Sequence, residues 1–293
     1  MAVSLSDETA EPTADYRSET AVIPPAESAG LAAGARRLRT ATQGLAIAAT
    51  AAYLARMTGT EDVILGLAVS GRTSRAAMET PAMLSTVLPL RVTVRPDMTV
   101  EELVRTVTRA SAQALRHQRY RREDLLRDLK LLGERRRLHG PVINIMAFDY
   151  RLDFAGLPAR THAITTGPID DLAINIYDNF DGTGLRVDFD AHPDLYTGDQ
   201  VSAHLRRYVR FLNTLGAADP STPLREVGLL DAAERSRVLD EWNDTALPVE
   251  PSVVPALFEA QAARTPDAPA VVHAGTTLTY RELDRRATAS PTA

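Results

Sequence analysis

The sequence has no cysteine among its 293 residues. Without cysteine the chain cannot form disulfides, thiolate metal sites or a cysteine nucleophile. A strong charge of one sign is also lacking, because the formal net charge is −5. This balance gives no general reason to expect binding to nucleic acid. Hydrophobic residues make up 44% and charged residues 24%, which is ordinary for a soluble globular protein.

The sequence also shows no membrane-spanning or secretory segment. The alanine-rich residues 29–55 are interrupted by Arg36, Arg37 and Arg39, so they do not form a hydrophobic span. The N-terminus is acidic and lacks the basic flank and apolar segment of a signal peptide. We therefore predict a cytoplasmic protein that binds neither membranes nor nucleic acid.

Clustered histidines are absent as well. The six histidines are separated from one another in the sequence, and no Gly-X-Ser-X-Gly elbow is present. The sequence therefore offers no histidine cluster for a metal ion and no serine elbow for nucleophilic catalysis. We predict no catalytic residue and no metal ligand in this chain.

The hydrophobic pattern that is present predicts helices and strands. Residues 31–56 contain no proline and many alanines, and they predict one helix that ends at Gly59. The apolar residues 63–69 and 88–94 predict strands, the first of them buried on both faces. The sequence Thr-Val-Glu-Glu at residues 99–102 has the pattern of a capping box, so a helix should begin there.

The following half of the chain continues the same alternation. Further strands are predicted at residues 142–149, 172–177 and 185–190, and a helix at residues 197–215. Helices interleaved with strands are typical of an α/β protein. The first part of the chain is rich in Glu, Ser, Thr, Ala and Pro without an apolar period, which predicts a mostly disordered arm over residues 1–30.

Residues 80–91 read Thr-Pro-Ala-Met-Leu-Ser-Thr-Val-Leu-Pro-Leu-Arg. They resemble a motif of the condensation domains of nonribosomal peptide synthetases, in which a glycine-containing turn precedes a strand ending in Leu-Pro-Leu-Arg. The chain departs from the motif at Ala82, where the family has glycine, and at Thr86, where it has asparagine. Alanine would be costly at a position that needs positive φ, and Thr86 keeps a hydrogen-bonding oxygen but loses the amide donors.

Residues 117–120 read His-Gln-Arg-Tyr and are similar to the family's His-Gln-X-Tyr motif at the end of a helix. Histidine is the side chain that exchanges protons near neutral pH. A histidine at a helix C-terminus also interacts favourably with the helix dipole, and this structural role is the favoured interpretation of His117. By resemblance, the residues expected to bind substrate or carrier are Ser85, Thr86, Arg91, His117 and Gln118.

An arginine-rich segment makes the middle of this acidic chain locally basic. A solvated face around two helices is the favoured interpretation, and docking of an acidic carrier domain or its phosphopantetheine phosphate is the alternative. The basic residues of this segment are Arg116, Arg119, Arg121, Arg122, Arg127, Lys130, Arg135, Arg136 and Arg137.

Later segments extend the resemblance. Residues 141–150 and 167–172 are similar to blocks of actinobacterial condensation domains. Residues 241–245, Glu-Trp-Asn-Asp-Thr, resemble the end of the linker between condensation and adenylation domains. Residues 278–283, Leu-Thr-Tyr-Arg-Glu-Leu, match the first core motif of an adenylation domain, next to a strand pair predicted around Gly275. We therefore predict a disordered arm at 1–30, a condensation-domain C-terminal lobe at 31–216, a linker at 217–252 and a truncated start of an adenylation domain at 253–293.

The resemblance implies the fold of one lobe of a condensation domain, which has two lobes similar to chloramphenicol acetyltransferase. Such a lobe has a mixed sheet with flanking helices, and this chain would supply the second one. The family's acyl transfer depends on a His-His-X-X-X-Asp-Gly motif in the first lobe, and this chain has no such motif. The resemblance also implies no directly bound cofactor, since phosphopantetheine is carried by partner carrier domains.

Three functions remain open from the sequence. The first is a truncated synthetase fragment, related to domains that join carrier-bound aminoacyl and peptidyl thioesters but without independent turnover. The second is a half-enzyme that is complemented by a separate lobe bearing the histidine motif. The third is a docking protein that holds carrier domains without catalysis. The expected partners are peptidyl or aminoacyl carrier domains and a missing N-terminal lobe.

Overall fold

The computed structural model describes residues 4–6, 8–131, 137–147, 152–159, 167–178, 182–246 and 253–289. The chain divides into two compact units, Met1–Asp231 and Ala232–Ala293.

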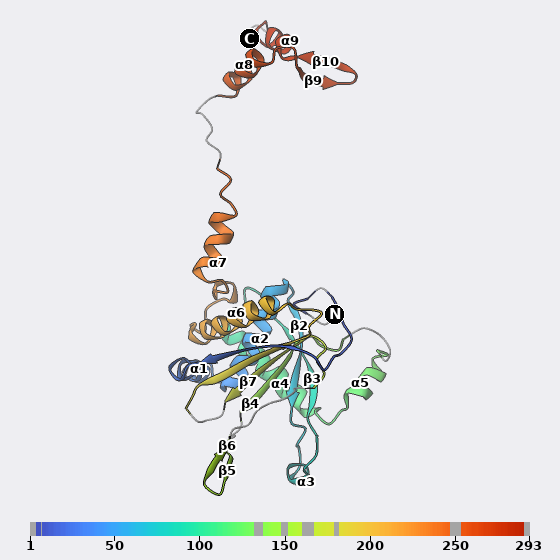
Figure 1. Ribbon diagram of the computed structural model, residues 1–293, viewed down its shortest axis with the longest axis vertical. Helices are drawn as coiled ribbons and strands as arrows, with labels where there is room; N and C mark the ends of the chain where they lie inside the picture. The colour runs from blue at the N-terminus through green and yellow to red at the C-terminus, as the bar shows by residue number, and fades with distance from the viewer. Residues whose placement is uncertain are drawn as a thin grey trace. The chain divides into compact units, whose positions relative to one another are not determined.

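The first unit is built on a six-stranded sheet with the strand order β1-β8-β7-β4-β2-β3 (Figure 1). Strand β4 runs parallel to both β2 and β7, and the other neighbouring strands are antiparallel, so the sheet is mixed. The strands are β1 (Arg17–Ile23), β2 (Asp62–Val69), β3 (Thr86–Thr93), β4 (Val142–Ala147), β7 (Leu172–Asp178) and β8 (Leu185–Ala191).

Strand β1 corrects the prediction of a disordered arm over residues 1–30. Arg17–Ile23 pairs with β8 along its whole length, and helix α1 (Pro25–Arg37) begins directly after it. The prediction was wrong because β1 is an edge strand with a largely exposed, polar sequence. Only Ile23 at its end is fully buried, so the main-chain hydrogen bonds to β8 hold a strand that the composition does not reveal.

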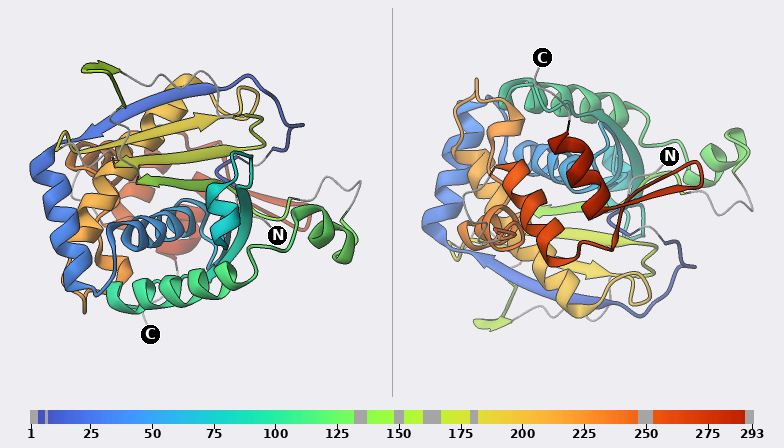
Figure 2. Two further views of the ribbon diagram at one scale, coloured as in Figure 1. Left: turned by 90° about the horizontal axis from the view of Figure 1, so that it is seen from below. Right: turned by 90° about the horizontal axis from the view of Figure 1, so that it is seen from above.

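Four helices pack together and against the sheet: α1, α2 (Thr42–Thr58), α4 (Val100–Arg116) and α6 (Gly198–Ala217) (Figure 2). Helix α2 lies at the centre of this layer, because every residue from Leu45 to Ala55 is buried. A helix that is apolar on all sides is expected to lie inside a core. The strands contribute alternate side chains to the same core, for example Val63 and Leu65 of β2 and Val187 and Phe189 of β8.

The single helix predicted for residues 31–56 is in fact two helices, α1 and α2. The break falls at Arg39, which adopts a left-handed conformation with φ 55°. The side chain of Arg37 donates to the carbonyl oxygens of Gly216 and Ala218 at 2.8 and 2.9 Å, which fixes the end of α1 against the end of α6. No glycine or proline marks this turn, so helix propensity alone predicted continuity. The predicted C-terminal glycine of α2 is confirmed, since Gly59 has φ 69°.

Helices α1 and α6 cross closely where two glycines meet. A Cβ atom built on Gly34 would lie 2.0 Å from the backbone oxygen of Gly216. No side chain fits this distance, so the crossing depends on glycine at residue 34. Hydrogen-bonded caps fix the start of two of the helices: Thr99 with Glu102 for α4, as predicted, and Thr197 with Gln200 for α6.

Residues 217–231 belong to the first unit, although the sequence placed them in a linker. Leu224 and Val227 are buried in the same core as the sheet. Arg56 of α2 donates to the carbonyl oxygens of both residues and ties this segment down. Isolated apolar residues between prolines gave no periodic signal, which is why the sequence predicted a linker here.

The second unit contains helix α7 (Ala232–Ser236), the π-helical turn η2 (Arg237–Glu241), α8 (Val254–Arg264), the antiparallel pair β9 (Pro269–His273) and β10 (Thr276–Thr279), and α9 (Tyr280–Thr288). The strand pair predicted around Gly275 is confirmed. The shorter elements of the first unit are α3 (Arg75–Glu79), α5 (Arg122–Asp128), β5 (Leu152–Phe154), β6 (Leu157–Ala159) and the 3-10 turn η1 (Leu224–Glu226). Within the described part of the chain, every helix is too short or too polar to span a membrane.

A buried aromatic cluster links α2 to α6 and predicts a pH dependence of stability. The Tyr53 hydroxyl and the His204 Nδ1 atom share a 2.7 Å hydrogen bond, and the Tyr196 ring packs edge-on against the His204 ring. Burial, with a smaller effect of the Arg207 charge, lowers the pKa of His204 from 6.5 to about 4. The unfolded chain therefore binds a proton at His204 between these two pH values and the folded chain does not.

We expect the free energy of unfolding to fall as the pH drops from 6.5 to about 4, because His204 is stable in the fold only as the neutral ring. The variant His204→Asn keeps an acceptor for Tyr53 but has no titrating group. Urea denaturation at several pH values should therefore show a smaller loss of stability on acidification for His204→Asn than for the unmodified chain. Equal losses for both proteins would contradict this assignment. His139 titrates in the same direction in both, since burial also lowers its pKa, and so it cancels in the comparison.

Candidate functional site

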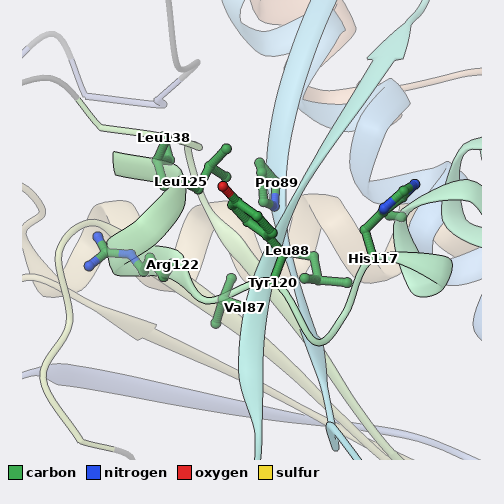
Figure 3. Close-up of a pocket in the computed structure, with 9 residues that line it drawn as sticks. Val87, Leu88, Pro89, His117, Tyr120, Arg122, Leu125 and Leu138 are labelled. Carbon is green, nitrogen blue, oxygen red and sulfur yellow. The ribbon is translucent and has the colours of Figure 1, made fainter. Parts of the chain in front are cut away.

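A pocket opens at the edge strand β3, where the end of α4 and helix α5 come together (Figure 3). Its volume is about 340 Å³. The walls are mainly apolar and consist of Val87, Leu88, Pro89, Ala114, Leu125 and Leu138. The structure thus places the Leu-Pro-Leu-Arg strand and the His-Gln-Arg-Tyr segment, two motifs that are distant in sequence, beside one cavity.

Pro89 suits the exposed edge that borders this pocket. Its partner across the strand pair is Gly66, whose N–H points away from β3 and donates to the Pro141 carbonyl oxygen at 2.9 Å. The ring nitrogen of Pro89 therefore faces the free edge of the sheet, where no ladder hydrogen bond is required. A proline at this position also discourages pairing with another strand, so the edge remains available as a pocket wall.

Three polar side chains complete the pocket: His117, Tyr120 and Arg122. The Tyr120 hydroxyl donates to Asp128 of α5, and this hydrogen bond raises the pKa of Tyr120. Arg122 lies 3.9 Å from a carboxylate oxygen of Asp170. Figure 3 shows the Tyr120 ring in the middle of the pocket, with His117 and Arg122 on opposite sides of it. The arrangement is an apolar cavity with exposed polar side chains at two of its borders.

His117 takes the structural position that the sequence favoured. It is the C-cap residue of α4, and its backbone N–H donates to the carbonyl oxygen of Ala114 at 2.9 Å. Its exposed side chain borders the pocket. A cap role and a ligand-binding role are compatible, because the backbone performs the first and the ring is left for the second.

The other predicted site residues do not meet in this pocket. Thr86 is the first residue of β3 and pairs with Val69 of β2. The exposed Ser85 hydroxyl donates to the Met83 sulfur at 3.3 Å. Gln118 is half-buried and does not line the pocket. Of the five predicted residues, only His117 lines this pocket. The pocket also borders β3, the strand that begins with Thr86.

Arg91 has a structural partner. Its guanidinium donates two hydrogen bonds of 2.8 Å to the carboxylate of Asp62 on β2. This pair holds the pKa of Asp62 below its usual range and raises that of Arg91. Because both side chains are exposed, solvent screens the pair and its contribution to stability is small.

The loop before β3 explains why alanine is tolerated at residue 82. Ala82 does not have positive φ, so the glycine of the family motif is not needed there for backbone reasons. The essential glycine of this loop is Gly71, with φ 66°, where a Cβ atom would lie 2.1 Å from the Leu84 carbonyl oxygen. The Arg72 side chain holds the loop by donating to the carbonyl oxygens of Ala77, Thr80 and Ala82.

The described residues of the arginine-rich segment do not form one continuous basic face. Arg127 pairs with Asp124 at 2.5 Å, and Arg137 is largely buried and pairs with Asp171 at 3.2 Å. Arg116, Arg119 and Arg121 are exposed near the pocket. Arg135 and Arg136 lie outside the described residues.

Sequence reasoning missed a buried polar cluster around Asp171. Its carboxylate accepts hydrogen bonds from the Tyr196 hydroxyl at 2.6 Å and from the Ser4 hydroxyl at 3.0 Å, and it pairs with Arg137. Burial raises the pKa of Asp171 despite these partners. The neighbouring Asp170 points toward Arg122, so the two acids face different surroundings. Only the doublet of adjacent acids was visible in the sequence, and the doublet does not show which one is buried.

Among the described residues no group of three or more histidine, aspartate or glutamate side chains could hold a metal ion. His139 is buried beside Gly66, and its Nδ1 atom lies 2.8 Å from the Gly140 carbonyl oxygen. His162 lies outside the described residues. Among the described residues, the pocket is thus defined by its shape and its apolar lining.

The mixed sheet, its layer of helices and the two motifs beside the pocket define an α/β lobe of the chloramphenicol-acetyltransferase type. The chain belongs to the condensation domain family, which matches residues 3–239. It is 40% identical to the dimodular nonribosomal peptide synthase of Bacillus subtilis over 97% of this chain, and 38% identical to the isonitrile lipopeptide synthase of Streptomyces coeruleorubidus over 94% of it.

Solved structures agree with this assignment. The first condensation domain of the calcium-dependent antibiotic synthetase, in complex with a substrate analogue, is 35% identical with a TM-score of 0.72 over 79% of this chain. The chain spans 50% of that solved domain, and it spans 12% and 18% of the two synthases. The fold predicted from the sequence is confirmed.

Proposed function

We propose that this chain is the C-terminal half of a condensation domain, of actinobacterial type, followed by a linker and the first residues of an adenylation domain. By itself it would not form peptide bonds. The observation that carries the proposal is the absence of any His-His-X-X-X-Asp-Gly sequence from a chain that matches half of a solved condensation domain. The domains related to it would join carrier-bound aminoacyl and peptidyl thioesters in the cytoplasm, with phosphopantetheine supplied by the carrier.

The sheet face turned away from the four helices supports this proposal. Along that face the Asn144 amide donates to Asn175, the Asn175 amide donates to Asp190, and the Ser18 hydroxyl donates to Asp190, at 3.2, 2.8 and 2.6 Å. The strand registers place these four side chains on the same face. Asn175 and Asp190 are buried within this lobe, whereas the half-buried Asn144 and the exposed Ser18 leave polar groups that suit contact with a second lobe.

The test is a peptide-bond assay with loaded donor and acceptor carrier proteins. We expect no product from this chain alone, because general-base chemistry needs the histidine motif that it lacks. The assay is repeated with a lobe bearing that motif supplied on a second polypeptide. The control is the same added lobe with its second motif histidine replaced by alanine, which should bind equally and give no product. Gel filtration of the mixture shows whether the two lobes associate.

Each outcome of this assay has a distinct meaning. Product from the chain alone would overturn the proposal. Product only with the intact added lobe would establish the half-enzyme alternative. Association with carrier proteins but no product, with a lobe that is shown to bind, would favour the docking function.

A further inference from the structure

A short surface segment, residues 8–13, precedes strand β1. Four of its six residues are exposed and the other two are half-buried, so none of them lies in the hydrophobic core. Two main-chain hydrogen bonds join it to the chain ahead of β7. The Thr13 N–H donates to the Ile169 carbonyl oxygen at 3.3 Å, and the Ile169 N–H donates to the Thr13 carbonyl oxygen at 2.9 Å. The segment thus forms a one-residue antiparallel bridge with Ile169.

A buried histidine provides the third attachment. The Nδ1 atom of His192 accepts a hydrogen bond from the Asp194 N–H at 3.2 Å, so its Nε2 atom carries the proton and donates to the Glu11 carbonyl oxygen at 2.9 Å. His192 is 1% exposed and Ile169 is 5% exposed. The lobe therefore supplies buried, fixed anchors, whereas the segment supplies only its own main-chain groups.

These contacts distinguish the segment from the parts of the chain on both sides of it. Upstream, the Ser4 hydroxyl donates to the buried Asp171 carboxylate at 3.0 Å, and Leu5 packs partly against the core. Downstream, β1 pairs with β8 along its whole length. Segments with few buried apolar contacts and with main-chain hydrogen bonds near solvent open without global unfolding. We propose that residues 8–13 form a strap, fixed at both ends, that lifts from the lobe and closes again while the six-stranded sheet stays folded.

Lifting the strap changes what the lobe presents to solvent. In the closed state the strap satisfies the N–H and the carbonyl oxygen of Ile169 and the Nε2 proton of His192. In the open state these three groups meet water, which replaces the lost hydrogen bonds, so opening costs much less than leaving a buried polar group without a partner. This local opening concerns the first unit alone and is independent of peptide-bond formation.

The test is amide hydrogen exchange of the full 293-residue chain, followed by NMR at several low urea concentrations. An amide that exchanges through local opening depends little on urea, whereas an amide that needs global unfolding depends on it strongly. We expect the protection factor of the Ile169 N–H to be at least about tenfold lower than that of the Ile174 N–H in β7, and to depend less on urea.

Two substitutions at one residue locate the opening. Thr13→Pro removes the N–H that donates to Ile169, and it should lower the protection factor of the Ile169 N–H about tenfold because the strap is then open more often. Thr13→Ala is the matched control. It removes the hydroxyl that accepts from the Asp15 N–H at 3.1 Å but keeps the main-chain bridge, so protection of Ile169 should change by less than about threefold. Protection of Ile174 should stay the same in both variants.

Equal protection and equal urea dependence for Ile169 and Ile174 would overturn the proposal, because the strap would then open only when the whole unit unfolds. An unprotected Ile169 N–H in the unmodified chain would also contradict it, since the strap would not be attached in solution. Equal effects of Thr13→Pro and Thr13→Ala would show that the main-chain bridge does not hold the strap.

Discussion

Replacing Asp171 by alanine is expected to lower the free energy of unfolding by about 3–5 kcal/mol, the usual cost of removing one partner from a buried ion pair. The guanidinium of Arg137 would lose its carboxylate while its side chain stays only 15% exposed. The hydroxyls of Tyr196 and Ser4 would lose their shared acceptor at the same time. The measurement is urea denaturation followed by far-ultraviolet circular dichroism at pH 7.

The matched control is the adjacent residue. Asp170→Ala removes a 3.9 Å contact to Arg122 between side chains that are both about 40% exposed, and it should cost less than about 1 kcal/mol. Two acids that are neighbours in sequence should therefore differ severalfold in their contribution to stability. Similar losses for the two variants would show that Arg137 and Asp171 do not form a pair in solution.

Asp171→Asn separates the charge from the hydrogen bonds. Asparagine keeps an oxygen for the Tyr196 hydroxyl but leaves Arg137 without a negative partner. We expect a loss between those of the other two variants. Since burial already raises the pKa of Asp171, part of the ion-pair energy is spent on desolvation, and the aspartate is better understood as fixing Tyr196 and Arg137 in place than as a source of large net stability.

Replacing Gly34 by alanine is expected to destabilise the chain by about 1–3 kcal/mol, the cost of forcing extra volume into a packed contact. The new methyl group would meet the Gly216 backbone oxygen at 2.0 Å. Backbone cannot rotate away as a flexible side chain can, so helices α1 and α6 would have to separate and Leu31 and Leu45 near the crossing would repack.

Gly30→Ala in the same helix is the control. A Cβ atom built on Gly30 meets nothing within 4 Å. Alanine is a better helix former than glycine, so this variant should gain about 0.5–1 kcal/mol. The midpoint of thermal or urea unfolding should thus fall for Gly34→Ala and rise for Gly30→Ala, although the two glycines lie only one helical turn apart. A stabilising Gly34→Ala would mean that the crossing is looser than the structure indicates.

The parts of the fold that local sequence patterns specify were predictable. The strand β2, the Thr99 capping box and the glycine at residue 59 are confirmed. The predicted burial of β2 on both faces is not, since Ile64 and Ala68 are only half-buried. The break at Arg39 and the strand β1 were not predictable in this way, because distant partners on α6 and β8 stabilise them.

The candidate site, too, was predictable from the sequence only in part. The sequence indicated the two motif segments, but nothing in it shows that His117 borders Val87 and Pro89, since that contact depends on how α4 crosses the sheet edge. Arg91 looked like a site residue because it ends a motif, and its partner Asp62 becomes apparent only when β2 and β3 are paired in register. The roles proposed for Ser85, Thr86, Arg91, His117 and Gln118 in binding substrate or carrier remain predictions.

The pairing of β1 with β8 also sets the order of events during synthesis. Thr20 and its partner Asp188 are 168 positions apart in the chain. At a translation rate of about 5–20 residues per second, roughly 8–34 s pass between the synthesis of β1 and the synthesis of β8. An apolar strand exposed for so long would tend to associate with other nascent chains, whereas charged and hydroxylated side chains resist this. The polar sequence of β1, which is also why it resembles a disordered arm, therefore lowers the tendency of the nascent chain to associate with others before β1 pairs with β8.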